Sequence, residues 1–321
     1  MQYKKKLILL ASSAAFLTLL YILTFVFDPA RRNARNERFS WLPANSRYEA
    51  DRIEIFHQEE KLEIVFKYGS WYVMLGQQEI PAREGKIDDL FRLLDTRGAF
   101  PRRGSNSASH GELGLDGSTR LVIRGGGGLP LLELFIGKDD PSGMGVFLRK
   151  NGENEFRSGD RLIGTYVKGD LNSWFDLKLF EDTSVVQVQR VAVNYRDFYG
   201  LGEEVSELPY ESYAVSRSGE NWIIGSVVDK SKTENWIQTI LEAQGDNIIL
   251  APKENMEALS DLFSIVAHIR LELGNGSALE LQIEKAKYDD TYAANVSGKP
   301  YIYVLSRWTA ANLLQNRDFF Q

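Results

Sequence analysis

Phe66-Lys67-Tyr68-Gly69-Ser70-Trp71-Tyr72-Val73 and Val215-Ser216-Arg217-Ser218-Gly219-Glu220-Asn221-Trp222-Ile223-Ile224 are the two stretches of this sequence that decide the fold. In both, a strand-like run leads into a turn that contains glycine, and a second strand-like run includes tryptophan. Glycine supplies the backbone freedom that tight hairpin turns require. Each stretch therefore predicts a β-hairpin, and meeting the same hairpin twice predicts an internal duplication.

The features around the two hairpins follow in the same order along the chain. Alternating apolar residues come first and predict half-buried strands. A helical pattern follows, then a second hairpin with a glycine turn, an acidic loop, two short strands and an aromatic end. The helical patterns are Ile87, Leu90, Phe91 and Leu94 in one copy and Trp236, Ile237, Ile240 and Leu241 in the other. We therefore predict an α+β fold of two tandem duplicated units, residues 51–180 and 181–321, each a mainly antiparallel sheet with a packed helix.

The first part of the chain predicts a membrane anchor. Residues 7–27 carry no charge, and a helix of that length crosses the hydrocarbon core of about 30 Å. The run leads into Phe27-Asp28-Pro29-Ala30, which lacks the pair of small residues that a cleavage site needs, so we expect a transmembrane helix and no signal-peptide cleavage. Residues 1–6 then form a short tail, and residues 28–50 form a juxtamembrane linker.

The charges on the two sides of this apolar run conflict. Three lysines precede it and favour a cytoplasmic N-terminus, whereas four arginines follow it and favour the opposite orientation. Long C-terminal domains cross membranes largely regardless of flanking charge, so we expect the tail inside and the body outside the cytoplasm. Arg31, Arg32 and Arg35 are either a solvated part of the linker or candidate contacts with anionic lipid head groups.

The composition of the 321 residues is that of a globular protein, with 43% hydrophobic and 26% charged residues. Without the three N-terminal lysines, the 38 basic residues become 35 against 44 acidic ones, a net charge of −9. A body this acidic repels phosphates, which argues against nucleic acid as a partner. The chain contains no cysteine, which excludes disulfides, thiol nucleophiles and cysteine-based zinc sites.

No catalytic or cofactor motif stands out, and we predict neither an enzyme nor a cofactor. Gly125-Gly126-Gly127-Gly128 leads into proline and an apolar strand, which fits a hairpin turn and not a phosphate loop. The acidic pairs Asp139-Asp140 and Asp289-Asp290 fit solvated loops better than calcium sites. The histidines lie in different predicted elements without metal-site spacing: His57, His110 and His268.

Four further segments carry a family resemblance: Glu112-Leu113-Gly114-Leu115-Asp116, Ile136-Gly137-Lys138, residues 143–149 and Trp174-Phe175-Asp176. Together with the tryptophan hairpin they resemble the DUF4340 family of bacterial envelope proteins of unknown function. The resemblance spans most of the body. It implies a single-pass protein of the bacterial inner membrane with a periplasmic body, and an accessory role beside ABC-type transporters of the gliding-associated kind. It supplies no catalytic residues.

The function we expect is therefore binding or scaffolding within an envelope complex, with the lipid bilayer and an ABC-type permease as partners. Trp174, near the end of the first unit, is a candidate interaction residue because tryptophan often anchors interfaces. Trp71 and Trp222 are more typical of core positions. Two other functions stay open: a cell-wall glycan-binding module that uses exposed aromatic residues, and an unrecognised hydrolase with a deep polar pocket.

Overall fold

The computed structural model describes residues 16–18, 21, 38–43, 45–95, 98–181, 183–196, 210–249, 263–287 and 290–321. The chain divides into two units, residues 1–175 and 176–321. Each unit contains its own large sheet and its own buried core.

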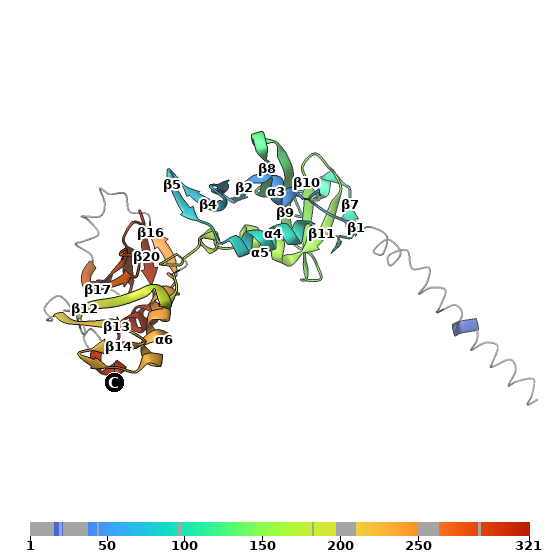
Figure 1. Cartoon of the computed structure of the whole chain (residues 1–321). Coiled ribbons are helices and arrows are strands. Elements are labelled where there is room, and N and C mark those ends of the chain that lie inside the picture. Colours follow the sequence, from blue (N-terminus) through green and yellow to red (C-terminus); the bar gives the residue numbers. More distant parts are fainter. Residues whose placement is uncertain are drawn as a thin grey trace, which may run out of the picture. The chain divides into compact units, whose positions relative to one another are not determined.

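The first unit is built on a nine-stranded antiparallel sheet (Figure 1). In spatial order the strands are β5 (Gln78–Pro81), β4 (Ser70–Leu75), β3 (Glu60–Lys67), β2 (Ala50–His57), β8 (Thr119–Gly125), β9 (Pro130–Asp139), β10 (Gly145–Lys150), β11 (Phe156–Asp160) and β7 (Arg102–Gly104). A separate two-stranded sheet pairs β1 (Arg38–Phe39) with β6 (Gly98–Ala99).

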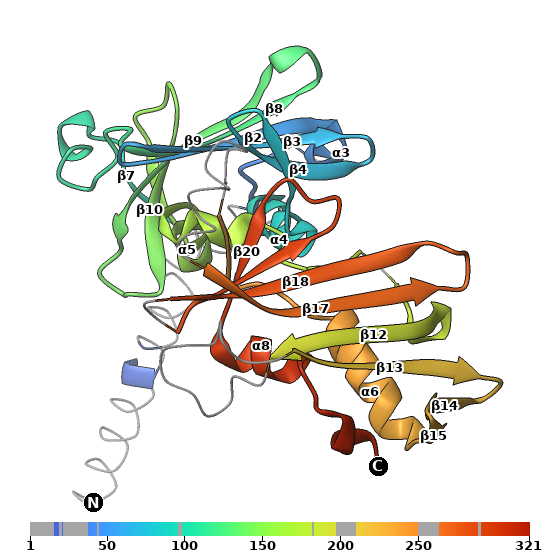
Figure 2. The ribbon, with the colours of Figure 1, turned by 90° about the vertical axis from the view of Figure 1, so that its left-hand side faces the viewer.

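The second unit is also a nine-stranded antiparallel sheet. In spatial order the strands are β15 (Ser226–Val227), β14 (Asn221–Ile224), β13 (Tyr210–Ser218), β12 (Val188–Arg196), β17 (Phe263–Leu273), β18 (Ala278–Ala286), β19 (Tyr292–Val296), β20 (Ile302–Leu305) and β16 (Asn247–Ile249). Figure 2 shows β18, β17, β12, β13 and β14 following one another across this sheet.

The two sheets share one topology. Each begins with four strands that pair in sequence order, then a helix, then a short strand at the far edge of the sheet. Four more strands follow, the first pairing with the opening strand and the last with the edge strand. In each unit a second helix follows the last of these strands. The two nine-stranded sheets therefore match strand for strand.

Helices cover one face of each sheet. In the first unit these are α4 (Glu84–Asp95) and α5 (Arg161–Lys168), and α5 contacts β2, β8, β9 and β10 (Figure 1). In the second they are α6 (Lys230–Leu241) and α8 (Arg307–Leu313), with α6 lying against the strands in Figure 2. Over residues 38–321, the described part of the chain also contains the short helices α3 (Ser46–Glu49), η1 (Ser107–Ser109), η2 (Gly126–Gly128), η3 (Leu171–Trp174), η4 (Val185–Gln187) and η7 (Arg317–Phe320).

The core contains the apolar residues that strand alternation and helical periodicity place on the inner side of each element. Gly69 and Gly219 occupy the two predicted turns with φ of 87° and 61°, in the left-handed region that glycine tolerates. Trp71 and Trp222, just beyond these turns, are 1% and 0% exposed, which confirms their interpretation as core residues. The apolar residues of the two predicted helices are buried within α4 and α6, as their spacing predicts.

The predicted α+β class is wrong. The structure is mostly β, with 46% of its residues in strands, two large antiparallel sheets and few helices. Several strands, such as β7 and β16, are too short to show alternation in the sequence, so their contribution was underestimated. The class also included a transmembrane helix over residues 7–27, which lies mostly outside the described residues. Within the described part of the chain, no helix is long and apolar enough to cross a membrane.

Candidate functional site: the open face of the first sheet

The face of the first sheet away from α4 and α5 carries an ordered set of charged side chains. Side chains alternate between the two faces of a strand. Ile53 and Ile55 are fully buried on the helix-covered side of β2, so Glu54 between them lies on the opposite, open face. Neighbouring strands place Lys61 of β3 and Arg124 of β8 beside Glu54.

Glu54 is the centre of this network. Arg124 Nε donates to its Oε2 over 2.8 Å, and Lys61 Nζ lies 2.9 Å from its Oε1. The Glu54 side chain is only 9% exposed, whereas its two partners are about one-third to one-half exposed. Burial by itself would raise the pKa of this carboxyl, but the hydrogen bonds from Arg124 and Lys61 and their positive charges lower it below its usual value.

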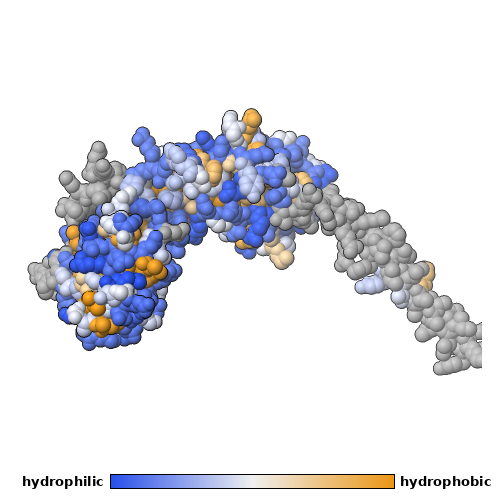
Figure 3. Space-filling model, in the orientation of Figure 1, coloured by the Kyte–Doolittle hydropathy of each residue, from blue (hydrophilic) through white to orange (hydrophobic). Residues whose placement is uncertain are grey.

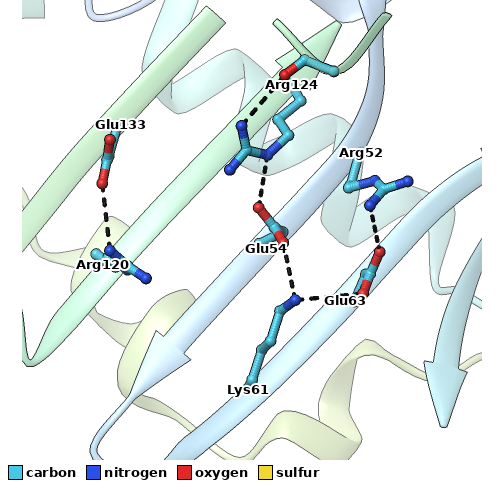
Figure 4. Close-up of polar contacts among 8 residues, drawn as sticks. Arg52, Glu54, Lys61, Glu63, Arg120, Arg124 and Glu133 are labelled. Atoms are coloured by element: carbon cyan, nitrogen blue, oxygen red, sulfur yellow. Dashed lines mark hydrogen bonds and ion pairs between the residues drawn. The ribbon is translucent and has the colours of Figure 1, made fainter. Parts of the chain in front are cut away.

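Ion pairs extend the Glu54 network over β8, β2 and β3, and a separate pair joins β8 to β9 (Figure 4). Arg52 lies 2.9 Å from Glu63, which is also 3.5 Å from Lys61, and Arg120 lies 3.5 Å from Glu133. The hydrogen bond to Glu54 is the main cause that raises the pKa of Lys61. Pairs that connect strands in this way fix the side chains in defined positions relative to one another.

An aromatic ring lies within the same face. The Arg120 guanidinium lies 4.0 Å from the centre of the Phe56 ring, and Lys61 Nζ lies 5.5 Å from it. Val122 points to this face between Arg120 and Arg124, yet it is only 3% exposed because the surrounding side chains cover it. The open face is thus a charged surface over a thin apolar layer, with its polar groups fixed and partly accessible.

The second unit has an open face of the same kind. Arg190 donates to Glu272 over 2.9 Å, and Arg270 donates to Glu280 over 2.6 Å, which links β12, β17 and β18. A shallow groove of about 320 Å³ crosses this face above small or polar side chains. Its floor includes Ala192, Ser212, Ala214 and His268.

Chemically, this arrangement is suited to binding. Glu54, Glu63 and Glu133 of the first open face each lie next to at least one cation, so their carboxylate oxygens are placed to accept hydrogen bonds. Half-exposed arginine and lysine groups can exchange part of their contacts for polar groups of a partner. In the view of Figure 3 the surface of the described residues is largely hydrophilic, with apolar residues in small scattered groups.

Trp174, the predicted interaction residue, lies in the interior of the first unit. It is 0% exposed, with the Lys86 ammonium 4.3 Å from its ring centre and the Tyr166 ring 6.1 Å away. Lys86 also donates to Ser173, and burial, followed by the charge of Arg83, lowers the pKa of Lys86 to about 8. Trp174 therefore joins η3 to α4 and α5. The other candidates, Arg31, Arg32 and Arg35, lie outside the described residues.

One of the loop acids that were predicted to be solvated, Asp140, is buried. Asp139 is half-exposed and lies 3.6 Å from Arg161, whereas Asp140 is buried. Ser142 and Ser158 donate to the Asp140 carboxylate and lower its pKa to about 2. These bonds shape the turn between β9 and β10. Asp290 of the second unit lies 3.7 Å from both Lys285 and Arg307, and Asp289 is outside the described residues.

The histidines are distributed over separate places in the two units. His57 shares a 2.9 Å hydrogen bond with Thr119, and His110 lies 3.0 Å from the carbonyl oxygen of Asn154. His268 is exposed on the open face of the second sheet. In the described part of the chain, no group of three His, Asp or Glu residues could hold a metal ion.

Sequence reasoning missed both the Glu54 network and one exposed tryptophan. Trp308 is 76% exposed as the second residue of α8, and Leu162, the second residue of α5, is 48% exposed. Aligning the two copies helix by helix would have placed both at the same outward position. The charges that alternate with Ile53, Ile55 and Leu62 were the available signal for the open face.

Comparison with known proteins adds no further assignment: no family model, no curated protein and no solved structure matches this chain.

Proposed function

We propose that this protein is a binding or scaffolding component of a bacterial envelope complex. In this proposal its N-terminal residues hold it at the inner membrane, and its two β-rich units lie outside the cytoplasm. An ABC-type permease is the expected partner class. The membrane location is supported by the uncharged sequence of residues 7–27, and the partner class is supported by the resemblance to the DUF4340 family.

One observation carries the proposal. The same topology occurs twice, and in each copy helices cover one face of the sheet while the other face displays cross-strand ion pairs. Fixed, complementary charges on an open surface favour specific protein contacts and suppress wrong partners. The proposal assigns the protein a role in assembly and no reaction.

Site-specific crosslinking tests this role. The chain has no cysteine, so Tyr72→Cys introduces a unique attachment point for a photoreactive group. Tyr72 alternates with buried Trp71 and Val73 and therefore lies on the open face of β4. We expect illumination of intact membranes to join position 72 to one membrane protein. Tyr68→Cys is the matched control, because Tyr68 is a turn residue that is 90% exposed, and it should give no adduct.

Two results would count against the proposal. Recovery of the full-length chain alone after crosslinking at position 72 would contradict the scaffolding role. Recovery of the chain in the soluble fraction of gently broken cells would contradict the membrane location.

A second candidate function is binding of cell-wall glycans. The observation that favours it is the exposure of Trp308, because an accessible indole can stack on a sugar ring. Under this alternative, the full chain in detergent should be retained on purified peptidoglycan, and Trp308→Ala should abolish retention. Trp222→Phe, a conservative change in the core, should leave retention intact.

A further inference from the structure

One corner of the first unit presents two exposed apolar side chains on neighbouring segments. Met144, in the turn between β9 and β10, is 80% exposed, and Leu162, at the start of α5, is 48% exposed. Arg161 joins the two segments, because its Nη1 donates to the carbonyl oxygen of Gly143 over 3.3 Å. This corner, defined by Met144, Leu162 and Arg161, therefore carries exposed apolar groups from two segments that the Arg161 side chain connects.

The turn that carries Met144 is firmly held. The Gly143 amide donates to the Asp140 carbonyl oxygen over 2.9 Å, and the Ser142 amide donates to the Asp140 carboxylate over 3.0 Å. Asp140 is itself buried against Ser158. Because these bonds fix the backbone, Met144 is kept at the surface and does not fold back into the core.

Basic groups lie around the corner. The Arg161 side chain is 61% exposed, and the Arg103 side chain is 45% exposed. The nearby acids are engaged within the unit: Asp139 pairs with Arg161, buried Asp140 lies 3.6 Å from Arg103, and Asp160 caps α5 through the Leu162 amide. Exposed apolar residues beside arginines match the boundary between lipid head groups and acyl chains.

The corner is also connected, through a pocket and Phe100, to β1 of the first unit. A pocket of about 380 Å³ is lined by residues that include Met144, Phe100 and Pro101. The Phe100 ring lies 6.2 Å from Phe39 of β1. Between the end of the uncharged run at Phe27 and β1 the chain can span about 35 Å when fully extended. A body tethered through that run keeps this corner within reach of the bilayer.

We propose that Met144 and Leu162 enter the head-group region of the lipid bilayer, while Arg161 and Arg103 contact lipid phosphates. This inference rests on the proposed membrane location and adds to it a defined orientation of the first unit. The partner is the membrane surface itself.

Fluorescent labels at single cysteines test this contact. Met144→Cys and Leu162→Cys each give the cysteine-free chain one thiol for an environment-sensitive label. Leu129→Cys is the matched control, because Leu129 is 69% exposed and lies at the opposite end of β9 from the turn that carries Met144. The full chain is inserted into nanodiscs of equal parts phosphatidylcholine and phosphatidylglycerol.

We expect labels at 144 and 162 to shift to shorter emission wavelength and to be quenched by lipids with a spin label near the head group. The label at 129 should show neither change. Emission at 144 and 162 that matches the aqueous control, in nanodiscs that retain the chain, would overturn this inference while leaving the tether intact. Failure of the chain to enter nanodiscs would overturn the membrane location as well.

Discussion

Glu54 is a nearly buried carboxylate between two cations on neighbouring strands, and its charge is coupled to folding. The network lowers its pKa in the folded state. A carboxyl with a lowered folded pKa stabilises the fold fully above its unfolded pKa of about 4.3. That contribution is lost as the pH falls from this value through the folded pKa.

Glu54→Gln should therefore lower the free energy of unfolding of the first unit by about 1–3 kcal/mol at pH 7, because hydrogen bonds to charged groups are lost. Urea unfolding at pH 7 and pH 3 measures the effect, and the gap from the wild type should narrow at pH 3. Glu63→Gln is the control, since its more exposed pair should contribute at most about 1 kcal/mol. An equal loss at both pH values would contradict this account.

Lys86 should couple to pH in a different range. Burial lowers its pKa to about 8 in the folded state, against about 10.4 in the unfolded chain. Between these values the unfolded chain binds more protons, so this residue's contribution to the free energy of unfolding rises with pH. The free energy of unfolding of the wild type minus that of Lys86→Met should therefore rise by up to about 1 kcal/mol from pH 8 to pH 10, after screening by solvent. A constant difference in chemical unfolding would refute this coupling.

At the scale of single elements, the sequence predicts well what depends on near neighbours. Apolar spacing located α4 and α6, and Gly125-Gly126-Gly127-Gly128 is the connection between β8 and β9, as the following proline and apolar strand indicated. The predicted α+β fold class is wrong because edge strands of two to four residues leave no periodic signal in the sequence. Such strands are defined by the partner they pair with, which local sequence does not contain.

The second helix of each unit begins at a side-chain cap that can be removed. Asp160 accepts a hydrogen bond from the Leu162 amide over 2.8 Å, and Ser306 accepts one from the Thr309 amide over 3.1 Å. Asp160→Ala and Ser306→Ala should each cost about 1 kcal/mol of stability, since a backbone donor at the helix start loses its partner. Thermal unfolding measures both. Asp139→Ala, which removes only an exposed ion pair, should have a smaller effect; equal losses would argue against capping.

At the scale of the whole molecule, the duplication explains both what could be predicted and what could not. The repeated hairpin, helix and second hairpin are visible in the sequence because each is local. The Glu54 network is not, because Glu54 and Arg124 are 70 residues apart and meet only through the register of β2 with β8. The burial of Trp174 likewise depends on α4, which lies much earlier in the chain. Alternation fixes the face on which a residue lies, but pairing fixes its neighbours.

Because each unit has its own core, a core substitution should destabilise the unit that contains it. Trp71 and Trp222 are equivalent, almost fully buried residues, one in each sheet. Trp71→Ala should remove about 3–5 kcal/mol from the first unit, and Trp222→Ala should do the same in the second, because each leaves a large cavity. Hydrogen exchange measured by mass spectrometry separates the units, since peptides report residues 1–175 and 176–321 independently.

We expect Trp71→Ala to speed exchange in peptides of the first sheet while those of the second keep wild-type protection, and Trp222→Ala to give the reverse pattern. Tyr68→Ala, at a 90% exposed turn position close to Trp71, should change neither. If Trp71→Ala reduced protection equally in both sheets, the two units would fold as one cooperative body. The topology would then still be duplicated, but each copy would depend on the other for its stability.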